Sequence, residues 1–214
     1  MKKLFLIGDS IRMGYCEYVK LALKGKAEVY WHTENARFAE YVLYSIGNWE
    51  AQLRMGEDLD CIHWNVGLHD VIRTMEDDTI TPPEIYAYYI DRICKRLRAY
   101  YPKAEMIFAT STPVQEELYG YWLSRKNADI DSINAAAVEV VAKHGIKVND
   151  LHALLKDKPL NYYSDMTHFN TPEAAELITK AVLKSVCPAL GIDYDELEMP
   201  DFSKILIAGD DVLK

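Results

Sequence analysis

Short apolar runs alternate with amphipathic stretches along almost the whole chain, and this alternation constrains the fold more than any other feature. Between the runs, apolar residues recur at helical spacing, as in Tyr86, Ile90, Ile93 and Leu97. Strands that alternate with helices are typical of a parallel sheet covered by helices. The sequence therefore predicts an α/β fold with a mainly parallel sheet. Its five expected strands are short and apolar, as strands buried on both faces should be: 3–8, 28–31, 61–66, 106–110 and 146–149.

The length of the chain suits one main domain. With 214 residues it can bury one sizeable hydrophobic core, and we expect this core within residues 1–190. The rest of the chain is acidic and ends in a short apolar run at residues 205–208. We interpret residues 191–214 as a C-terminal extension without an assigned role.

The charge balance and the apolar runs exclude several classes of partner. A formal net charge of −9 disfavours nucleic acid, whose binding requires clustered Lys and Arg side chains. The apolar run after Lys2 and Lys3 meets Asp9 too early for a signal peptide, and no run approaches the roughly 20 apolar residues that span a bilayer. We therefore expect a soluble, cytoplasmic protein without a membrane span. The sequence leaves its oligomeric state open.

Helix boundaries are marked by capping residues. Thr81-Pro82-Pro83-Glu84 has the form of a capping box with proline at the first helical position, and Thr171-Pro172-Glu173 repeats the pattern. The last long helix should therefore begin shortly after His168. Residues 38–46 form another helical stretch, and Gly47 behind it has the character of a helix terminator.

Candidate functional residues follow the expected strands, because ligands of open parallel sheets bind outside the carboxyl ends of the strands. Ser10 lies on a Gly-containing turn after the first strand, where its hydroxyl would be presented at the sheet edge as a nucleophile. The alternative is that Ser10 only caps the following helix.

A carboxylate and an imidazole lie three residues apart in Asp165-Met166-Thr167-His168, close enough for the acid to orient the ring. A serine needs such a base to become nucleophilic. The alternative is a surface Asp with a His near a helix cap. The four cysteines lack disulfide or metal-finger spacing, so we expect free thiols and no metal.

These residues resemble the motif blocks of the SGNH (GDSL-like) hydrolase family. Gly8-Asp9-Ser10 is similar to the first block, Gly67-Leu68-His69-Asp70 to the Gly-x-Asn-Asp block, and Asp165-Met166-Thr167-His168 to the final Asp-x-x-His. The resemblance covers nearly the whole chain. It implies a flavodoxin-like three-layer α/β/α sandwich in which Ser10 attacks an acyl carbon, His168 is its base and Asp165 orients the histidine. It implies no cofactor.

Two departures from the family pattern concern the oxyanion hole, to which Ser10 contributes its backbone N–H. His69 stands where the family has an asparagine, and a neutral imidazole still offers one N–H to the oxyanion. The alternative is a buried, hydrogen-bonded histidine. The segment after the second strand lacks the family's glycine, so the donor there is Asn35 or Ala36, and we assign it to Asn35.

Further residues near the strand ends are candidates for lining the substrate pocket. We expect Arg12, Arg37 and Gly67 there, although charged loop residues are often merely solvated. Among the tryptophans, Trp31, Trp64 and Trp122 are candidates for stacking on a sugar, and the alternative is that they belong to the core.

The resemblance implies a serine esterase that acts on a small-molecule ester, with an O-acetyl group on a sugar as one candidate. Lipid and thioester substrates stay open. Acyl transfer by the same triad is an alternative, and so is a non-catalytic ligand-binding module, because a flavodoxin-like fold does not by itself imply chemistry.

Overall fold

The computed structural model describes residues 1–75 and 77–208. Within these residues five strands form one sheet in the order β2-β1-β3-β4-β5, and all neighbouring strands are parallel. The α/β prediction is confirmed, and each strand lies where the sequence placed it to within two residues at either end. The strands are β1 (Lys2–Ile7), β2 (Ala27–Trp31), β3 (Cys61–Trp64), β4 (Glu105–Ala109) and β5 (Lys147–Asn149).

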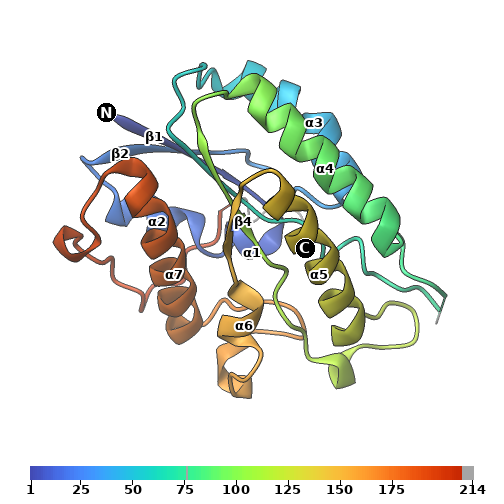
Figure 1. Ribbon diagram of the computed structural model, residues 1–214. Coiled ribbons are helices and arrows are strands. Elements are labelled where there is room, and N and C mark those ends of the chain that lie inside the picture. Colours follow the sequence, from blue (N-terminus) through green and yellow to red (C-terminus); the bar gives the residue numbers. More distant parts are fainter. Residues whose placement is uncertain (76, 209–214) are drawn as a thin grey trace.

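Helices cover both faces of the sheet, so the molecule has three layers (Figure 1). One face carries α3 (Ala39–Leu53), α4 (Pro83–Tyr100) and α5 (Asn127–Lys143), which pack side by side. The other face carries α1 (Ser10–Met13), α2 (Cys16–Ala22) and α7 (Pro172–Leu190). The remaining short helices are α6 (Leu151–Leu155) and the 3₁₀ helices η1 (Glu116–Leu118), η2 (Leu160–Tyr162) and η3 (Tyr194–Glu196).

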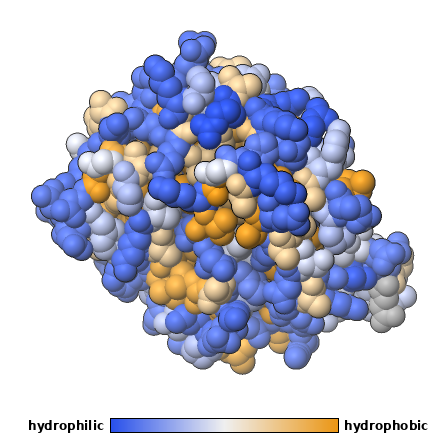
Figure 2. All heavy atoms as spheres, viewed as in Figure 1, coloured by the Kyte–Doolittle hydropathy of each residue, from blue (hydrophilic) through white to orange (hydrophobic). Residues whose placement is uncertain are grey.

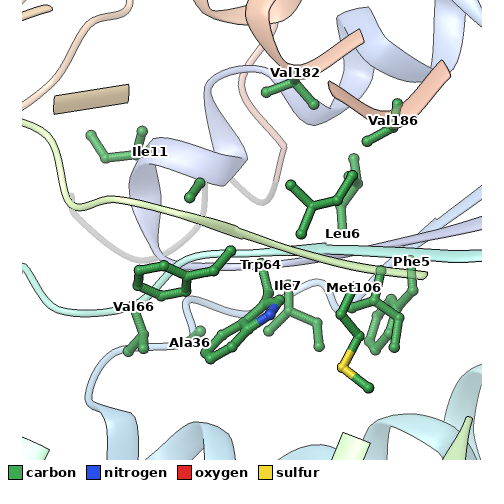
Figure 3. Packing of buried hydrophobic residues seen from close by; sticks show 14 of the residues in the cluster. Phe5, Leu6, Ile7, Ile11, Ala36, Trp64, Val66, Met106, Val182 and Val186 are labelled. Carbon is green, nitrogen blue, oxygen red and sulfur yellow. The ribbon is translucent and has the colours of Figure 1, made fainter. Parts of the chain in front are cut away.

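The core lies on both sides of β1, whose side chains alternate between the two faces. Figure 3 shows Leu6 on the side of Val182 and Val186 of α7, and Ile7 on the opposite side with Trp64. All these side chains are fully buried. A central strand without a solvent-exposed face explains the continuous apolar run in the sequence.

Helix boundaries follow the sequence signals only in part. Thr171 caps α7 by accepting the N–H of Ala174, as predicted. The N-cap of α4 is Pro82 instead of Thr81, and no side chain caps this helix. The prediction for Gly47 is wrong, because α3 continues through it to Leu53. A Cβ atom at Gly47 would lie 2.8 Å from the Tyr100 hydroxyl, so glycine there allows close packing of α3 against α4.

The C-terminal extension folds back onto the first helices as far as the structure describes it. The Tyr18 hydroxyl of α2 donates to the carbonyl of Lys204 at 2.6 Å and accepts the N–H of Leu206 at 2.9 Å. Ala208 donates its N–H to the carbonyl of Met13. Residues 191–208 therefore contact the main domain, and residues 209–214 lie outside the described part.

The face shown in Figure 2 is mostly hydrophilic, with apolar side chains in patches between the hydrophilic ones.

The four cysteines are buried as free thiols. Among the helices of the described residues, none combines the length and apolar character required to cross a membrane.

Candidate active site

Ser10 is the first residue of α1, directly after the turn that ends β1. The N-cap of this helix is Asp9, whose carboxylate accepts the N–H of Ile11 at 3.0 Å and a side-chain N–H of Asn65 at 3.0 Å. Because Asp9 caps the helix, the Ser10 hydroxyl is not needed for capping. The capping interpretation of Ser10 is therefore wrong.

The Ser10 hydroxyl meets the imidazole of His168 across 158 positions of sequence. Ser10 Oγ lies 2.8 Å from His168 Nε2, and His168 Nδ1 lies 2.7 Å from Asp165 Oδ2. This is the order of contacts that a serine nucleophile, its base and an orienting acid require. The three residues come from the loop after β1 and the loop before α7.

Asp165 is held as an anion by hydrogen bonds. Burial disfavours its charged form, but the backbone N–H groups of Thr167 and His168 and the His168 imidazole outweigh this effect and hold its pKa below the usual range. An ionised Asp165 accepts a hydrogen bond from the Nδ1–H of His168, which leaves Nε2 free to accept the proton of Ser10.

Three residues that line the cavity carry candidate donors to an oxyanion. The backbone N–H of Ser10 makes no hydrogen bond within residues 1–75 and 77–208, and Asn35 and His69 line the same cavity as Ser10. Ala36, the other donor considered, gives its N–H to the carbonyl of Gly8 at 3.1 Å and is therefore occupied. The side-chain oxygen of Asn35 accepts the N–H of Arg37, which fixes the loop after β2.

His69 is an unpartnered imidazole at this site. Its ring forms no hydrogen bond with the described residues and lies edge-to-face with Phe38. Burial lowers its pKa, and the positive charges of Arg125 and Arg37 lower it further, against the opposing effect of Asp9. A neutral imidazole carries one N–H, so His69 can donate to a developing negative charge.

The cavity in front of Ser10 has a volume of about 590 Å³. It is formed by segments that follow four strands, β1, β2, β3 and β4, and by the loop before α7. The candidate residues that follow these strands therefore line one cavity at the carboxyl ends of the strands, where ligands of open parallel sheets bind. Besides Ser10, Asn35, His69, Asp165 and His168, it is lined by Leu68, Ile72, Tyr119, Gly120, Trp122, Leu123, Arg125, Met166 and Thr167.

Three expected pocket residues lie elsewhere. Arg12 is fully buried under the turn, where its guanidinium donates to the carbonyls of Glu34 at 2.7 Å and Gly8 at 3.4 Å. Arg37 is exposed outside the cavity, with its guanidinium over the Tyr41 ring. Gly67 is absent from the cavity wall. It adopts φ +145°, and a Cβ there would meet Ser111 Oγ at 2.3 Å, so its role is structural.

The three tryptophans have different environments. Trp64 is fully buried in the core against Phe108. Trp31 is half-buried beneath Lys20. Trp122 is 73% exposed and lines the cavity, so it alone of the three is accessible from the site.

In the segment that follows β4, sequence reasoning named Trp122 but missed the other residues that line the cavity, Tyr119, Gly120, Leu123 and Arg125. Gly120 and Leu123 pair across a tight hairpin, and Arg73 pairs with Ser124 beside it. At the start of the hairpin, the Tyr119 hydroxyl lies 2.6 Å from Oγ1 of Thr167, the residue before His168. The available signal was the aromatic pair Tyr121-Trp122 between the fourth strand and the next long helix.

No group of three or more His, Cys, Asp or Glu side chains suited to holding a metal ion occurs among residues 1–75 and 77–208. The buried His63 does not face the cavity. Its Nε2 lies 3.0 Å from the Asn149 amide and its Nδ1 lies 3.3 Å from the Tyr15 hydroxyl, and burial lowers its pKa to about 3.

No protein-family model and no curated protein matches the sequence. The structure is nevertheless similar to solved structures. A lipase/acylhydrolase from Enterococcus faecalis aligns with a TM-score of 0.71 at 17% identity, over 94% of this chain and 99% of the other. An acetyl xylan esterase aligns at 0.68 and 14%, over 86% and 99%. A GDSL-like lipase from Bacteroides thetaiotaomicron aligns at 0.67 and 16%, over 88% and 89%. The chain has the fold of the SGNH (GDSL-like) hydrolases.

Proposed function

We propose that the protein is a serine ester hydrolase with Ser10 as nucleophile. The observation that carries this proposal is the uninterrupted chain of contacts from Ser10 Oγ to His168 Nε2 at 2.8 Å and from His168 Nδ1 to Asp165 at 2.7 Å. The three residues line a cavity, which leaves room for a substrate at the Ser10 hydroxyl. The proteins of the same fold are lipases, acylhydrolases and esterases by name, which supports this class of reaction.

In the proposed reaction, Ser10 Oγ attacks the ester carbonyl carbon while His168 Nε2 takes the hydroxyl proton. The tetrahedral intermediate expels the alcohol, which receives that proton from His168, and Ser10 remains acylated. Water then adds to the acyl carbon, gives a proton to His168, and the acid leaves as Ser10 regains its proton. Asp165 keeps the imidazole oriented and stabilises it while it is charged.

The negative charge of the tetrahedral intermediate requires hydrogen-bond donors. We assign this role to the Ser10 N–H, a donor at Asn35 and the neutral imidazole of His69. Donors that are fixed before the reaction stabilise the transition state without reorganising.

For the substrate we propose a small acyl ester on a sugar. The exposed indole of Trp122 lies on the wall of the cavity, and the Tyr121 ring meets it edge-to-face at 5.4 Å between centroids. An exposed aromatic face beside the nucleophile suits stacking against the apolar face of a sugar ring. The acetyl xylan esterase of the same fold supports an acetyl group as the acyl part.

The test of the chemistry is active-site labelling with a fluorophosphonate probe, which reacts only with an activated serine. We expect the wild-type protein to be labelled at Ser10 and to hydrolyse 4-nitrophenyl acetate. Ser10→Ala should lose both properties, whereas Ser185→Ala, a half-buried serine of α7 away from the cavity, should keep them. Labelling of Ser10→Ala at the wild-type rate would refute the proposal.

The test of the substrate is a panel of 4-nitrophenyl esters with two, four and eight acyl carbons, together with ethyl acetate and acetylated xylo-oligosaccharides. We expect the highest kcat/KM with acetyl esters. Trp122→Ala should raise KM for the oligosaccharide and change that for ethyl acetate much less, because ethyl acetate has no ring that can stack on the indole. A preference for the eight-carbon ester would contradict the acetyl assignment.

A further inference from the structure

Arg125 places a buried positive charge in the wall of the cavity that holds Ser10. Its side chain comes from the segment after the 119–124 hairpin and is 8% exposed. Two of its nitrogens are occupied: Nε donates to the carbonyl of Leu68 at 2.6 Å, and Nη1 donates to the Tyr119 hydroxyl at 2.9 Å. These contacts fix the guanidinium in one orientation beside Leu68, the residue that precedes His69.

The charge of Arg125 has no counter-ion within residues 1–75 and 77–208. Arg73, in contrast, makes two hydrogen bonds to the carboxylate of Asp129, at 2.7 and 2.8 Å. Among the described residues, Asp165 is the one carboxylate in the wall of the cavity, and it is already bound by Thr167 and His168. Arg125 Nη2 makes no hydrogen bond with the described residues.

A guanidinium that is largely shielded from water and has no anion beside it is costly, because burial disfavours an unpaired charge. Its two present partners, a carbonyl and a hydroxyl, satisfy hydrogen bonds and leave the charge unneutralised. The cavity, however, gives a ligand access to this side chain and to Ser10 at the same time. An anionic group of the substrate would therefore supply the negative charge that the described residues do not place beside Arg125.

We propose that Arg125 binds a carboxylate carried by the ester substrate, so that the enzyme selects anionic esters over neutral ones. This proposal rests on the proposed esterase function and names a specificity residue for it. Nη2 keeps both of its N–H groups, and Nη1 keeps its second one, so donors remain for charged hydrogen bonds to a carboxylate. Arg125 is held in advance by Leu68 and Tyr119, so little freedom is lost when the anion binds.

The stacking surface and the charge lie on the same cavity, which places the carboxylate in the alcohol part of the substrate, as in an acetylated uronic acid. Trp122 would contact the sugar ring and Arg125 its carboxylate while Ser10 meets the acetyl group. The alternative is a carboxylate at the far end of the acyl part. The substrates of the experiment distinguish a carboxylate in the alcohol part from one in the acyl part.

The experiment compares matched pairs of esters. For the alcohol part the pair is 4-acetoxybenzoate and its neutral methyl ester, and for the acyl part it is 4-nitrophenyl hemiglutarate and 4-nitrophenyl pentanoate. Wild type, Arg125→Gln, Arg125→Lys and Arg92→Gln are assayed on all four. Arg92 is an exposed arginine of α4, so its variant removes the same charge far from the cavity.

We expect Arg125→Gln to lower kcat/KM for 4-acetoxybenzoate by about 10- to 100-fold relative to the methyl ester, because a charged hydrogen-bonding partner is lost. Arg125→Lys should retain part of the preference, and Arg92→Gln all of it. A drop that is equal for the charged and the neutral ester would mean that Arg125 only holds the hairpin, and this result would overturn the proposal. A preference confined to the hemiglutarate pair would overturn the placement of the carboxylate in the alcohol part.

Binding to Ser10→Ala, measured by calorimetry, separates this proposal from the proposed function. We expect Ser10→Ala to bind 4-acetoxybenzoate more tightly than its methyl ester, with the difference lost when Arg125→Gln is added. Equal affinities would overturn the carboxylate site even if wild type hydrolyses both esters. Conversely, a wild-type protein that binds the anion without hydrolysing it would overturn the esterase function and leave the site standing. Should Arg125→Gln fail to fold, the two affinities of Ser10→Ala still decide the question.

Discussion

The carbonyl oxygen of Gly8 accepts the backbone N–H of Ala36 at 3.1 Å, and this bond joins the turn that carries Ser10 to the loop after β2. The buried guanidinium of Arg12 supports the same junction from below through the carbonyls of Gly8 and Glu34. The loop is thereby fixed beside the nucleophile with Asn35 on the cavity wall. A donor at Asn35 can thus be held rigidly although the family's glycine is absent.

Substitution of His168 should reduce activity more than substitution of Asp165. We expect His168→Ala to abolish hydrolysis of 4-nitrophenyl acetate, because no other base contacts Ser10 Oγ in the described chain. Asp165→Asn should lower kcat by about 10²- to 10⁴-fold, because an amide favours the wrong tautomer of the imidazole. Steady-state kinetics of both purified variants checks this order. Full activity of His168→Ala would require another base.

Substitutions of His69 test whether its side chain is an oxyanion donor or only a packing residue. If its N–H faces the oxyanion, His69→Ala should lower kcat by about 10²- to 10³-fold with little change in KM. His69→Asn should recover part of this loss, because a carboxamide also offers an N–H. Single-turnover rates of the three proteins on one ester measure the effect. Equal rates would remove His69 from the mechanism.

The sequence was sufficient for the sheet, and it named the three residues that the structure brings into contact, Ser10, Asp165 and His168, because these signals are local. A buried parallel strand is a continuous apolar run, and each motif directly follows a strand or precedes a capped helix. Arg125 carries no local signal. Its importance depends on the Leu68 carbonyl, 57 positions away, and on the lack of a counter-ion within the described chain.

The misplaced residues show the same limit. Gly47 was expected to end a helix, but the close approach of Tyr100 decides its place in the middle of α3. Arg12 was expected in the pocket, but the carbonyls of Gly8 and Glu34 draw its guanidinium inward. Both outcomes depend on contacts between distant segments, and a glycine or an arginine has no sequence pattern that reveals such contacts.

Gly67 should be among the glycines least tolerant of substitution. Its φ of +145° is strained for any residue with a side chain, and a Cβ would lie 2.3 Å from Ser111 Oγ and 2.7 Å from Ile133 Cδ1. We expect Gly67→Ala to lower the free energy of unfolding by about 2–4 kcal/mol. Urea unfolding measures the change. Gly120→Ala is the matched control, since no atom lies within 4 Å of its added Cβ, and a loss for this variant as large as for Gly67→Ala would contradict the steric argument.

Asp70 should make the stability of the protein depend on pH in an unusual direction. Its carboxylate accepts the N–H of Ala39, the first residue of α3. Burial raises its pKa to about 7, although hydrogen bonds from Thr81 and Ala39 favour the charged form. Between about pH 4 and pH 7 the folded state therefore holds a proton on Asp70 that the unfolded state has lost. The contribution of Asp70 to stability is fully present below about pH 4 and declines as the pH rises to about 7.

The buried His63 acts in the opposite direction, because its pKa falls to about 3 on folding and its contribution to stability rises with pH over the acidic range. Wild-type protein alone would show the sum of the two effects, so the comparison with Asp70→Asn is needed. We expect the free energy of unfolding of wild type, relative to Asp70→Asn, to decrease by up to about 4 kcal/mol between pH 4 and pH 7.5. Urea unfolding of both proteins at several pH values measures this difference. A difference that stays constant over the range would show that Asp70 is ionised in the folded protein well below pH 7, with its bond to Ala39 outweighing the cost of burial.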